Sequence, residues 1–318
     1  MPHLTVGLCP SLTQAVLHSL SAAGLRNAVD FVAADLEDVS RKSSVPFKEL
    51  IAIRRVLLAK YSSPPQTGSQ VYNDFIESVA ILKTGCSSID KLLGGGLHTG
   101  ELTEVIGSAA SGKTQLCLSA TAHLIEASKS NVLYIDTCGS FDCARLEEML
   151  IERGLQEEVV VSSLQKVRCC HTFDIFELLD TCTKLRDDIG NQEDVFTQDV
   201  KLLVIDSVSA VLSPCLGGMQ FEGLTMMVHL ARILKQIACE FAVAILLTNN
   251  VVYGEGGNVR AALGKQWQSI PNTRIYLDKA QENTSEEQSC RQVTLVKSSK
   301  QAVCKRILKF KISRQGCL

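Results

Sequence analysis

The chain has 318 residues, of which 46% are hydrophobic and 21% are charged. This composition is typical of a globular protein with a full core, and the length allows one large domain plus a smaller one. The formal net charge of −2 argues against a protein that coats nucleic acid non-specifically, because neutralising phosphates requires clustered lysines and arginines. Any contact with nucleic acid must therefore come from local patches.

We expect neither a secretion signal nor a membrane span. The first residues lack the charged start and continuous apolar core of a signal peptide. No run of about 18 apolar residues occurs along the chain. The 13 cysteines lie largely in apolar runs, where cysteine behaves as a small hydrophobe. Free thiols in a reducing compartment are therefore a better interpretation than a disulfide framework.

Residues 1–60 predict a small all-α domain. Apolar residues recur at helical spacing from residue 12 onward, and Gly24 stands where the first helix would end. A later helix begins near Pro46 and places Leu50, Ile53 and Leu57 on one face. The following stretch, SSPPQTGSQ, is rich in Ser, Pro and Gly, so we expect a linker over residues 61–79.

Residues 80–318 predict an α/β core. Helical stretches separate five short apolar runs, LTEVI, NVLYI, KVRCC, KLLVI and VAILL. This alternation indicates a mostly parallel sheet buried on both faces. Beyond Thr273 the helices stop, and TRIYLD, QVTLVK and ILKFKIS predict antiparallel C-terminal strands that close the sheet.

The motif GSAASGKT predicts a phosphate-binding loop, because it fits G-x-x-x-x-G-K-[ST]. Glycines let successive backbone N–H groups point at phosphate oxygens. Lys113 would reach the β and γ phosphates of ATP, and the Thr114 hydroxyl would bind Mg²⁺. The weaker alternative is a Gly/Ser-rich turn with an exposed lysine. The residues expected to bind the nucleotide in this loop are Gly107, Ser108, Ala109, Ala110, Ser111, Gly112, Lys113 and Thr114.

Two further strand ends supply candidate ligands. Asp206 ends KLLVID, where a carboxylate can hold Mg²⁺ through water, although an Asp after a strand is also a common helix cap. Asn250 ends VAILLTNN, where a polar side chain can sense the γ-phosphate. An ordinary turn built on Asn is an equally good interpretation of Asn250.

These motifs stand in an order that resembles the RecA-like recombinases of eukaryotes and archaea. KTGCSSIDKLLGGGLHTGELTEVIGSAASGKTQLC is followed by VLYIDTCGSF, LLVIDSVSAV and LLTNNVV, and the resemblance covers roughly residues 80–278. The stretches LCPSLT, LIAIRRVLLA and IPNTRIYLD are most similar to the delta-type paralogues of vertebrates. The resemblance implies a RecA-like P-loop NTPase core that binds ATP and Mg²⁺. It also implies action in homologous-recombination repair in the nucleus, within hetero-oligomers of related paralogues.

The departures from the family pattern concern hydrolysis and self-assembly. Active members resemble YIDTEGTF, with a Glu that orients the attacking water, and Cys138 stands at that position. Thiols are mostly neutral at pH 7 and are poor proton acceptors. Asp136 is a candidate substitute, because it would face the same side if the strand continues. The family's Gln is replaced by Asn250, and its Phe-x-x-Ala plug by Gln66 and Ser69. We therefore expect weak or partner-dependent hydrolysis and no autonomous filament.

The two loops that contact DNA in the family predict modest binding of single-stranded DNA. The first, LSPCLGGMQFE, has no Lys or Arg, whereas the second carries Arg260 and Lys265. Trp267 in the second loop either stacks on a base or packs in the core, and core packing is the favoured interpretation. Residues 285–318 hold eight lysines and arginines against two glutamates, which suits either a DNA path or a solvated strand edge. Three functions stay open: a repair adaptor, an autonomous recombinase, and an unrelated P-loop enzyme.

Overall fold

The computed structural model describes residues 4–62, 65–192, 194–217, 221–254, 259–280, 289–303 and 306–318. The chain divides into two compact units, Met1–Asp74 and Phe75–Leu318. None of the described helices is long and apolar enough to cross a bilayer. The twelve cysteines within these ranges are all free thiols.

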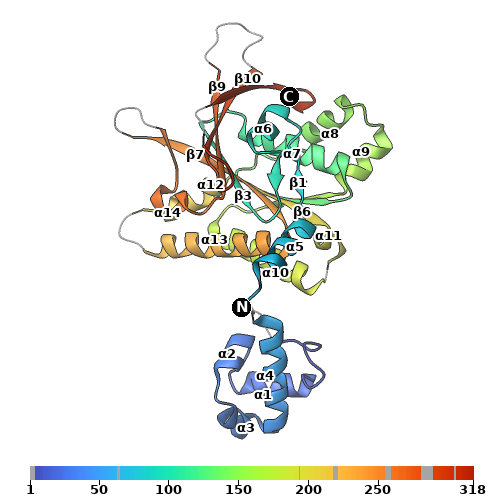
Figure 1. Ribbon diagram of the computed structural model, residues 1–318, viewed down its shortest axis with the longest axis vertical. Coiled ribbons are helices and arrows are strands. Elements are labelled where there is room, and N and C mark those ends of the chain that lie inside the picture. Colours follow the sequence, from blue (N-terminus) through green and yellow to red (C-terminus); the bar gives the residue numbers. More distant parts are fainter. Residues whose placement is uncertain are drawn as a thin grey trace. The chain divides into compact units, whose positions relative to one another are not determined.

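The N-terminal unit is helical, as predicted (Figure 1). Its first helices begin at polar caps, since the side chains of Thr13, Asn27 and Asp35 each accept a bond from a backbone N–H one turn into the helix. Leucines, isoleucines and one phenylalanine, Phe31, fill a core of their own beneath these helices. The helices are α1 (Gln14–Ala22), α2 (Ala28–Ala33), α3 (Leu36–Ser43) and α4 (Phe47–Tyr61).

A helix, α5 (Gly68–Ser78), lies within the stretch expected to be a linker. Its start is stabilised by Thr67, whose hydroxyl accepts a hydrogen bond from the Gln70 N–H at 3.3 Å. Val71, Tyr72 and Ile76 leave half or more of their surface exposed on this helix. The Ser- and Gly-rich composition hid this helix from the sequence analysis.

The second unit is built on a large sheet with the strand order β12-β11-β10-β9-β3-β7-β6-β4-β5 (Figure 1). All five apolar runs form strands, and these strands pair in parallel. They are β3 (Leu102–Gly107), β4 (Asn131–Asp136), β5 (Val167–His171), β6 (Val200–Asp206) and β7 (Ala244–Tyr253). A short strand, β8 (Val259–Ala261), pairs with β7 alone.

One of the three expected closing strands differs from the prediction. The strand β9 (Thr273–Lys279) runs parallel to β3, so it is the sixth parallel strand. The antiparallel part begins only with its next neighbour, because β9 pairs in parallel with β3 on one side and antiparallel with β10 on the other. The antiparallel strands are β10 (Cys290–Lys297), β11 (Ile307–Ser313) and β12 (Gly316–Cys317).

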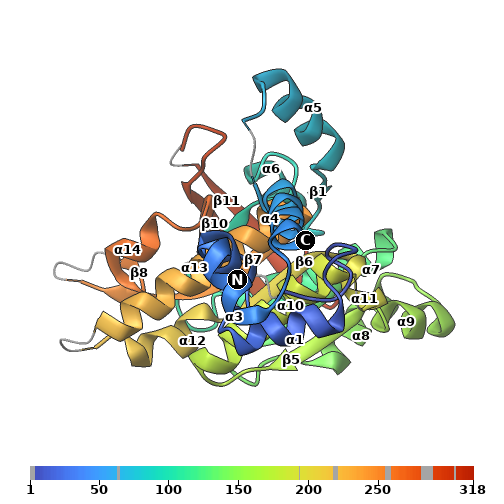
Figure 2. The ribbon, with the colours of Figure 1, turned by 90° about the horizontal axis from the view of Figure 1, so that it is seen from below.

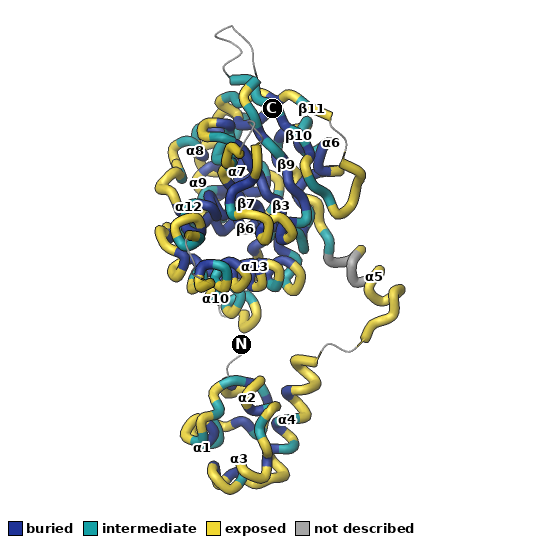
Figure 3. The backbone as a smooth tube through the Cα atoms, turned by 90° about the vertical axis from the view of Figure 1, so that its left-hand side faces the viewer, coloured by how far each residue is buried: buried dark blue, intermediate teal, exposed yellow. Residues whose placement is uncertain are grey.

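Helices cover both faces of the sheet, and the strands lie buried between them (Figures 2 and 3). On one face pack α6 (Ser87–Leu92), α7 (Lys113–Ala127), α8 (Cys143–Glu152) and α9 (Glu157–Leu164). On the other pack α10 (Ile175–Asn191), α12 (Val208–Leu212), α13 (Phe221–Phe241) and α14 (Gly264–Gln268). Short elements complete the unit: β1 (Ile81–Leu82), β2 (Leu97–His98), α11 (Val195–Gln198) and the 3₁₀ turn Ser213–Cys215. Burial on both faces explains why the strand sequences are continuously apolar.

Candidate nucleotide-binding site

The predicted site residues gather at one edge of the sheet, where the parallel strands end. Gly107 at the end of β3 pairs with Asn250 on β7. Asp136 at the end of β4 pairs with Asp206 at the end of β6. The carboxyl edge of a parallel sheet is where ligands bind in open α/β folds.

The phosphate loop joins β3 to α7 and requires its two glycines. A Cβ atom on Gly107 would lie 2.4 Å from Ser111 Oγ and 2.6 Å from the Leu277 carbonyl oxygen. Gly112 has φ +103°, and a Cβ there would lie 2.8 Å from Ile312 Cδ1. The loop therefore curls tightly into the N-terminus of α7, whose free N–H groups and dipole favour an anion.

Lys113 lies over this loop at the start of α7. Its Nζ donates hydrogen bonds to the carbonyl oxygens of Gly107 at 2.8 Å and Ser108 at 3.0 Å. Burial lowers the pKa of Lys113, while the negative charge of Asp206 opposes that shift. A partly buried ammonium beside a helix N-terminus gives the loop the positive charge that polyphosphate binding needs.

Asp206 is held by three hydroxyl groups. Thr114 Oγ1 donates to Asp206 Oδ2 at 2.6 Å and Tyr134 Oη donates to the same oxygen at 3.0 Å, while Thr248 Oγ1 donates to Oδ1. Burial raises the pKa of Tyr134 well above its usual value, and the nearby Asp206 adds to the effect, so its hydroxyl stays protonated and donates. Thr114 and Asp206 thus bring together a hydroxyl and a carboxylate, oxygen ligands that suit Mg²⁺.

Cys138 lies at this edge with an exposed side chain. Its Sγ is 3.8 Å from Ser207 Oγ and 3.6 Å from Thr137 Oγ1. No carboxylate stands at this position.

Asp136 holds the turn that carries Cys138. Its carboxylate is fully buried and accepts bonds from the backbone N–H groups of Cys138, Ser140 and Phe141 at 2.9–3.1 Å. Burial opposes ionisation, but these three donors outweigh it and lower the pKa of Asp136. His171 Nδ1 lies 3.5 Å from Asp136 Oδ2. Every oxygen of Asp136 is therefore engaged within the fold, which favours a structural role.

Asn250 and its neighbour Asn249 have different environments. The side chain of Asn250 is exposed, and its backbone N–H donates to Ser209 Oγ at 3.1 Å. Asn249 is fully buried and donates through Nδ2 to Glu104 Oε1 at 2.8 Å. Only Asn250 is placed to meet a ligand.

A buried polar cluster around Glu104 escaped the sequence analysis. Glu104 on β3 accepts bonds from Asn249, from Trp267 Nε1 at 2.7 Å and from Arg274 Nε on β9. Glu104 and Trp267 have no exposed surface, and Arg274 has 5%. A charged residue inside each of two apolar strands, LTEVI and TRIYL, was the signal available.

The DNA-contact candidates follow β7 in the chain, and Arg260 pairs with Val252 near the end of that strand. Arg260 on β8 and Lys265 on α14 are both exposed, so both stay available to a ligand. Trp267 packs in the core, in agreement with the favoured interpretation, so it offers no face for base stacking. Parts of both predicted loops, residues 218–220 and 255–258, lie outside the described residues.

Several basic residues of the C-terminal region form hydrogen bonds or ion pairs within the second unit. Lys297 Nζ donates to three carbonyl oxygens at the end of α14 and beyond, including Pro271 at 2.6 Å. Lys300 pairs with Glu101 at 3.0 Å, and Arg314 lies 3.7 Å from Glu152. This favours the interpretation of a charged strand edge over a continuous DNA path.

A phosphate loop between β3 and α7, a carboxylate at the end of β6 and a mostly parallel sheet define a RecA-like P-loop nucleotide-binding core. Comparison with protein families agrees with this class. The sequence model of the Rad51 family matches residues 76–284, and the chain belongs to that family. Residues 1–60 match the model described as "RAD51D, N-terminal domain".

Curated relatives extend the similarity over most of the chain. "DNA repair protein RAD51 homolog 4" of Bos taurus is 43% identical over 89% of this chain and 87% of its own length. The protein of that name from Mus musculus is 42% identical over 95% of this chain and 92% of its own length. "DNA repair and recombination protein RadA" of Aeropyrum pernix is 27% identical over 86% of each chain.

Proposed function

We propose that this chain is an ATP-binding adaptor in homologous-recombination DNA repair. It acts in the nucleus within a hetero-oligomer of RecA-like paralogues and hydrolyses ATP slowly or only with a partner. The relatives named as DNA repair proteins support the process. The geometry of the nucleotide site supports the adaptor role.

The observation that carries this proposal is that the site keeps the groups for binding ATP and lacks the carboxylate for orienting water. The loop, Lys113, and the Thr114–Asp206 pair retain what is needed to hold ATP and Mg²⁺. At the position of the water-orienting carboxylate stands the thiol of Cys138, and Asp136 is committed to the turn. Bound Mg²⁺–ATP supplies a charged group that a neighbouring core can also contact, so binding alone can stabilise an assembly.

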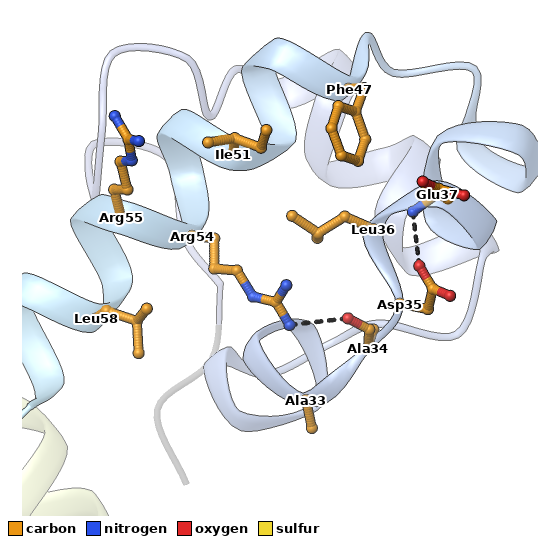
Figure 4. A pocket seen from close by; sticks show the side chains of 10 residues that line it. All are labelled: Ala33, Ala34, Asp35, Leu36, Glu37, Phe47, Ile51, Arg54, Arg55 and Leu58. Atoms are coloured by element: carbon orange, nitrogen blue, oxygen red, sulfur yellow. Dashed lines mark hydrogen bonds between the residues drawn. The ribbon is translucent and has the colours of Figure 1, made fainter.

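A groove on the N-terminal unit supports a docking role for that unit. It has a volume of about 600 Å³ and lies between α4 and the α2–α3 segment (Figure 4). Phe47 and Leu58 are exposed there by 42% and 46%, beside the charged side chain of Arg55. Exposed apolar side chains with a charged rim are typical of protein interfaces. We assign this groove to a paralogous chain.

Contact with single-stranded DNA is assigned to Arg260 and Lys265. Two exposed cations predict modest affinity that falls with salt, with a slope near −0.7 per phosphate neutralised. The first loop offers no cation, which supports the adaptor role over that of an autonomous recombinase.

Gel filtration of the full chain with ATP tests the adaptor role against the autonomous recombinase. We expect a stable complex when paralogous chains are added. When single-stranded DNA alone is added, we expect no species as large as a filament. Long filaments formed by this chain alone on DNA would overturn the adaptor role. A chain that fails to bind any paralogue, with or without ATP, would overturn it as well.

A further inference from the structure

The β11–β12 hairpin, residues 307–317, packs against the phosphate loop as well as against the core. Leu308, Phe310 and Ile312 alternate along β11, so they lie on one face of the sheet. Phe310 belongs to the buried core cluster around α7, and Leu308 and Ile312 pack against that cluster. Ile312 also reaches the loop, because a Cβ atom on Gly112 would lie 2.8 Å from its Cδ1. The side chain of Ile312 therefore forms one wall of the phosphate loop.

Gly112 has a backbone conformation that its neighbours must hold. It precedes Lys113 as the N-cap of α7 and has φ +103°. Its conformation decides where the first N–H groups of α7 point, and these are the groups expected to meet phosphate. Glycine has no side chain to restrict its backbone, so it loses more conformational entropy than other residues when a loop is fixed. Ile312 occupies the space where a side chain of Gly112 would lie, and so it restrains this residue.

Polar contacts fasten the hairpin to the helix that begins at the loop. The Cys317 N–H donates to Ser119 Oγ on α7 at 3.1 Å. Arg145 on α8 donates through Nη1 to the Arg314 carbonyl oxygen at 3.1 Å and through Nε to Gln115 Oε1, also at 3.1 Å. Gln115 lies in the first turn of α7. The hairpin is thus tied to the phosphate-binding end of α7 by a polar link in addition to the apolar contact.

We propose that Ile312 is a positioning residue for ATP binding, and that the β11–β12 hairpin and bound ATP stabilise each other. The hairpin holds Gly112 in the conformation that presents the N–H groups, and a polyphosphate bonded to these groups fixes the loop against the hairpin. Such a linkage is reciprocal, because two contacts that favour the same conformation strengthen each other equally. The inference rests on the proposed function and deepens it, because it assigns part of the affinity for ATP to residues outside the phosphate-loop motif.

Ile312→Ala in the full chain tests the contact. We expect a fluorescent ATP analogue with Mg²⁺ to bind more weakly by about fivefold or more, the lower end of coupling between two sites. Leu308→Ala is the matched control, since it truncates an aliphatic side chain on the same face of the same strand, about 13 Å away. Both substitutions should lower the midpoint of urea unfolding, whereas only Ile312→Ala should lower the affinity for ATP. Ile312→Leu keeps the volume of the side chain and should bind ATP within about twofold of wild type.

Hydrogen exchange of the wild-type chain tests the reverse direction without any substitution. The backbone N–H groups of Lys311 and Leu318 each donate to the other's carbonyl oxygen, at 3.0 and 2.8 Å, so their exchange reports opening of the hairpin. We expect Mg²⁺–ATP to slow this exchange by about fivefold or more as well. Exchange in α10, which packs on the opposite face of the sheet, is the control and should not change.

Three outcomes would overturn the positioning role. Ile312→Ala could bind ATP as tightly as wild type, Leu308→Ala could bind it as weakly as Ile312→Ala, or ATP could leave the exchange of the hairpin unchanged. In each case the wild-type chain still binds ATP, so the proposed function stands. A wild-type chain that does not bind the analogue overturns the proposed function and this inference together. If Ile312→Ala does not fold, Ile312→Val takes its place, and wild-type affinity in that variant overturns the role equally.

Discussion

Lys113 places one ammonium group at the loop where the phosphates of ATP are expected. We predict that Lys113→Ala weakens ATP binding at least tenfold, because a charge-assisted contact worth more than about 1.4 kcal/mol is lost. Lys129→Ala removes an exposed lysine beyond the end of α7 and is the control. Binding of a fluorescent ATP analogue measures both. Wild-type affinity in Lys113→Ala would contradict the assignment of the phosphate loop.

Cys138 occupies the position at which active family members carry the water-orienting glutamate. We predict that Cys138→Glu raises ATP turnover by roughly 10²–10⁴-fold, the usual contribution of such a group. The exposed side chain leaves room for the larger residue. Phosphate release under single-turnover conditions measures the effect, with Cys143→Glu, also exposed, as the control. Unchanged turnover would show that another missing part limits hydrolysis.

The buried carboxylate of Asp136 makes the free energy of unfolding depend on pH. Its folded-state pKa lies below the usual 3.8, so the stabilisation is complete above about pH 4 and is lost as the pH falls through the lowered pKa. We predict that Asp136→Asn costs about 2 kcal/mol at pH 7, because the three N–H bonds lose a charged acceptor. The difference from wild type should shrink below pH 3.8 in urea unfolding. Asp187→Asn, which changes a half-exposed carboxylate on α10, is the control. A difference that is constant with pH, or an equally large loss in Asp187→Asn, would contradict the structural role of Asp136.

At the scale of elements, the Glu104 cluster joins β3 to β9 and α14. Glu104→Ala would leave Arg274 buried without its counter-ion, and it would remove the acceptor of Trp267 and one of the two acceptors of Asn249. We predict a loss of about 3–5 kcal/mol in the free energy of unfolding. Chemical denaturation followed by Trp267 fluorescence measures it. Glu152→Ala, which breaks an exposed pair with Arg314, should cost at most about 1 kcal/mol. Equal effects of the two substitutions would refute the role of the cluster.

The sequence predicted those elements whose patterns lie within one short stretch of the chain. The five apolar runs and the phosphate loop were found because each pattern lies within a few neighbouring residues. The direction of β9 and the Glu104–Arg274 pair could not be found, because they join residues about 170 positions apart. The three hydroxyl groups on Asp206 come from α7, β4 and β7, so their meeting also depends on the completed sheet.

At the scale of the whole molecule, the two compact units allow two separate partners. We predict that residues 1–60 and residues 80–318, expressed separately, capture different paralogous chains. The four-helix unit has its own core, so it should fold alone. Co-purification with each candidate chain is the measurement. Capture of the same single chain by both halves, or of none by either, would contradict two-sided docking.

The nucleotide site should influence only one of these contacts. Lys113→Ala is expected to lower the affinity of residues 80–318 for their partner. The affinity of residues 1–60 for theirs should not change, since ATP can stabilise only the contact that it bridges. Equal loss of both partners would indicate misfolding.

The exposed thiol at Cys138 also makes this chain chemically addressable inside a mixed assembly. Family members with a glutamate at that position have no nucleophilic sulfur there, so an adenosine analogue carrying a mild electrophile would become covalently attached to this subunit alone. Such a reagent would block one nucleotide site permanently while neighbouring sites continue to exchange ATP. A thiol where the resemblance implies a glutamate would thereby give pharmacology a way to silence one member of a mixed assembly.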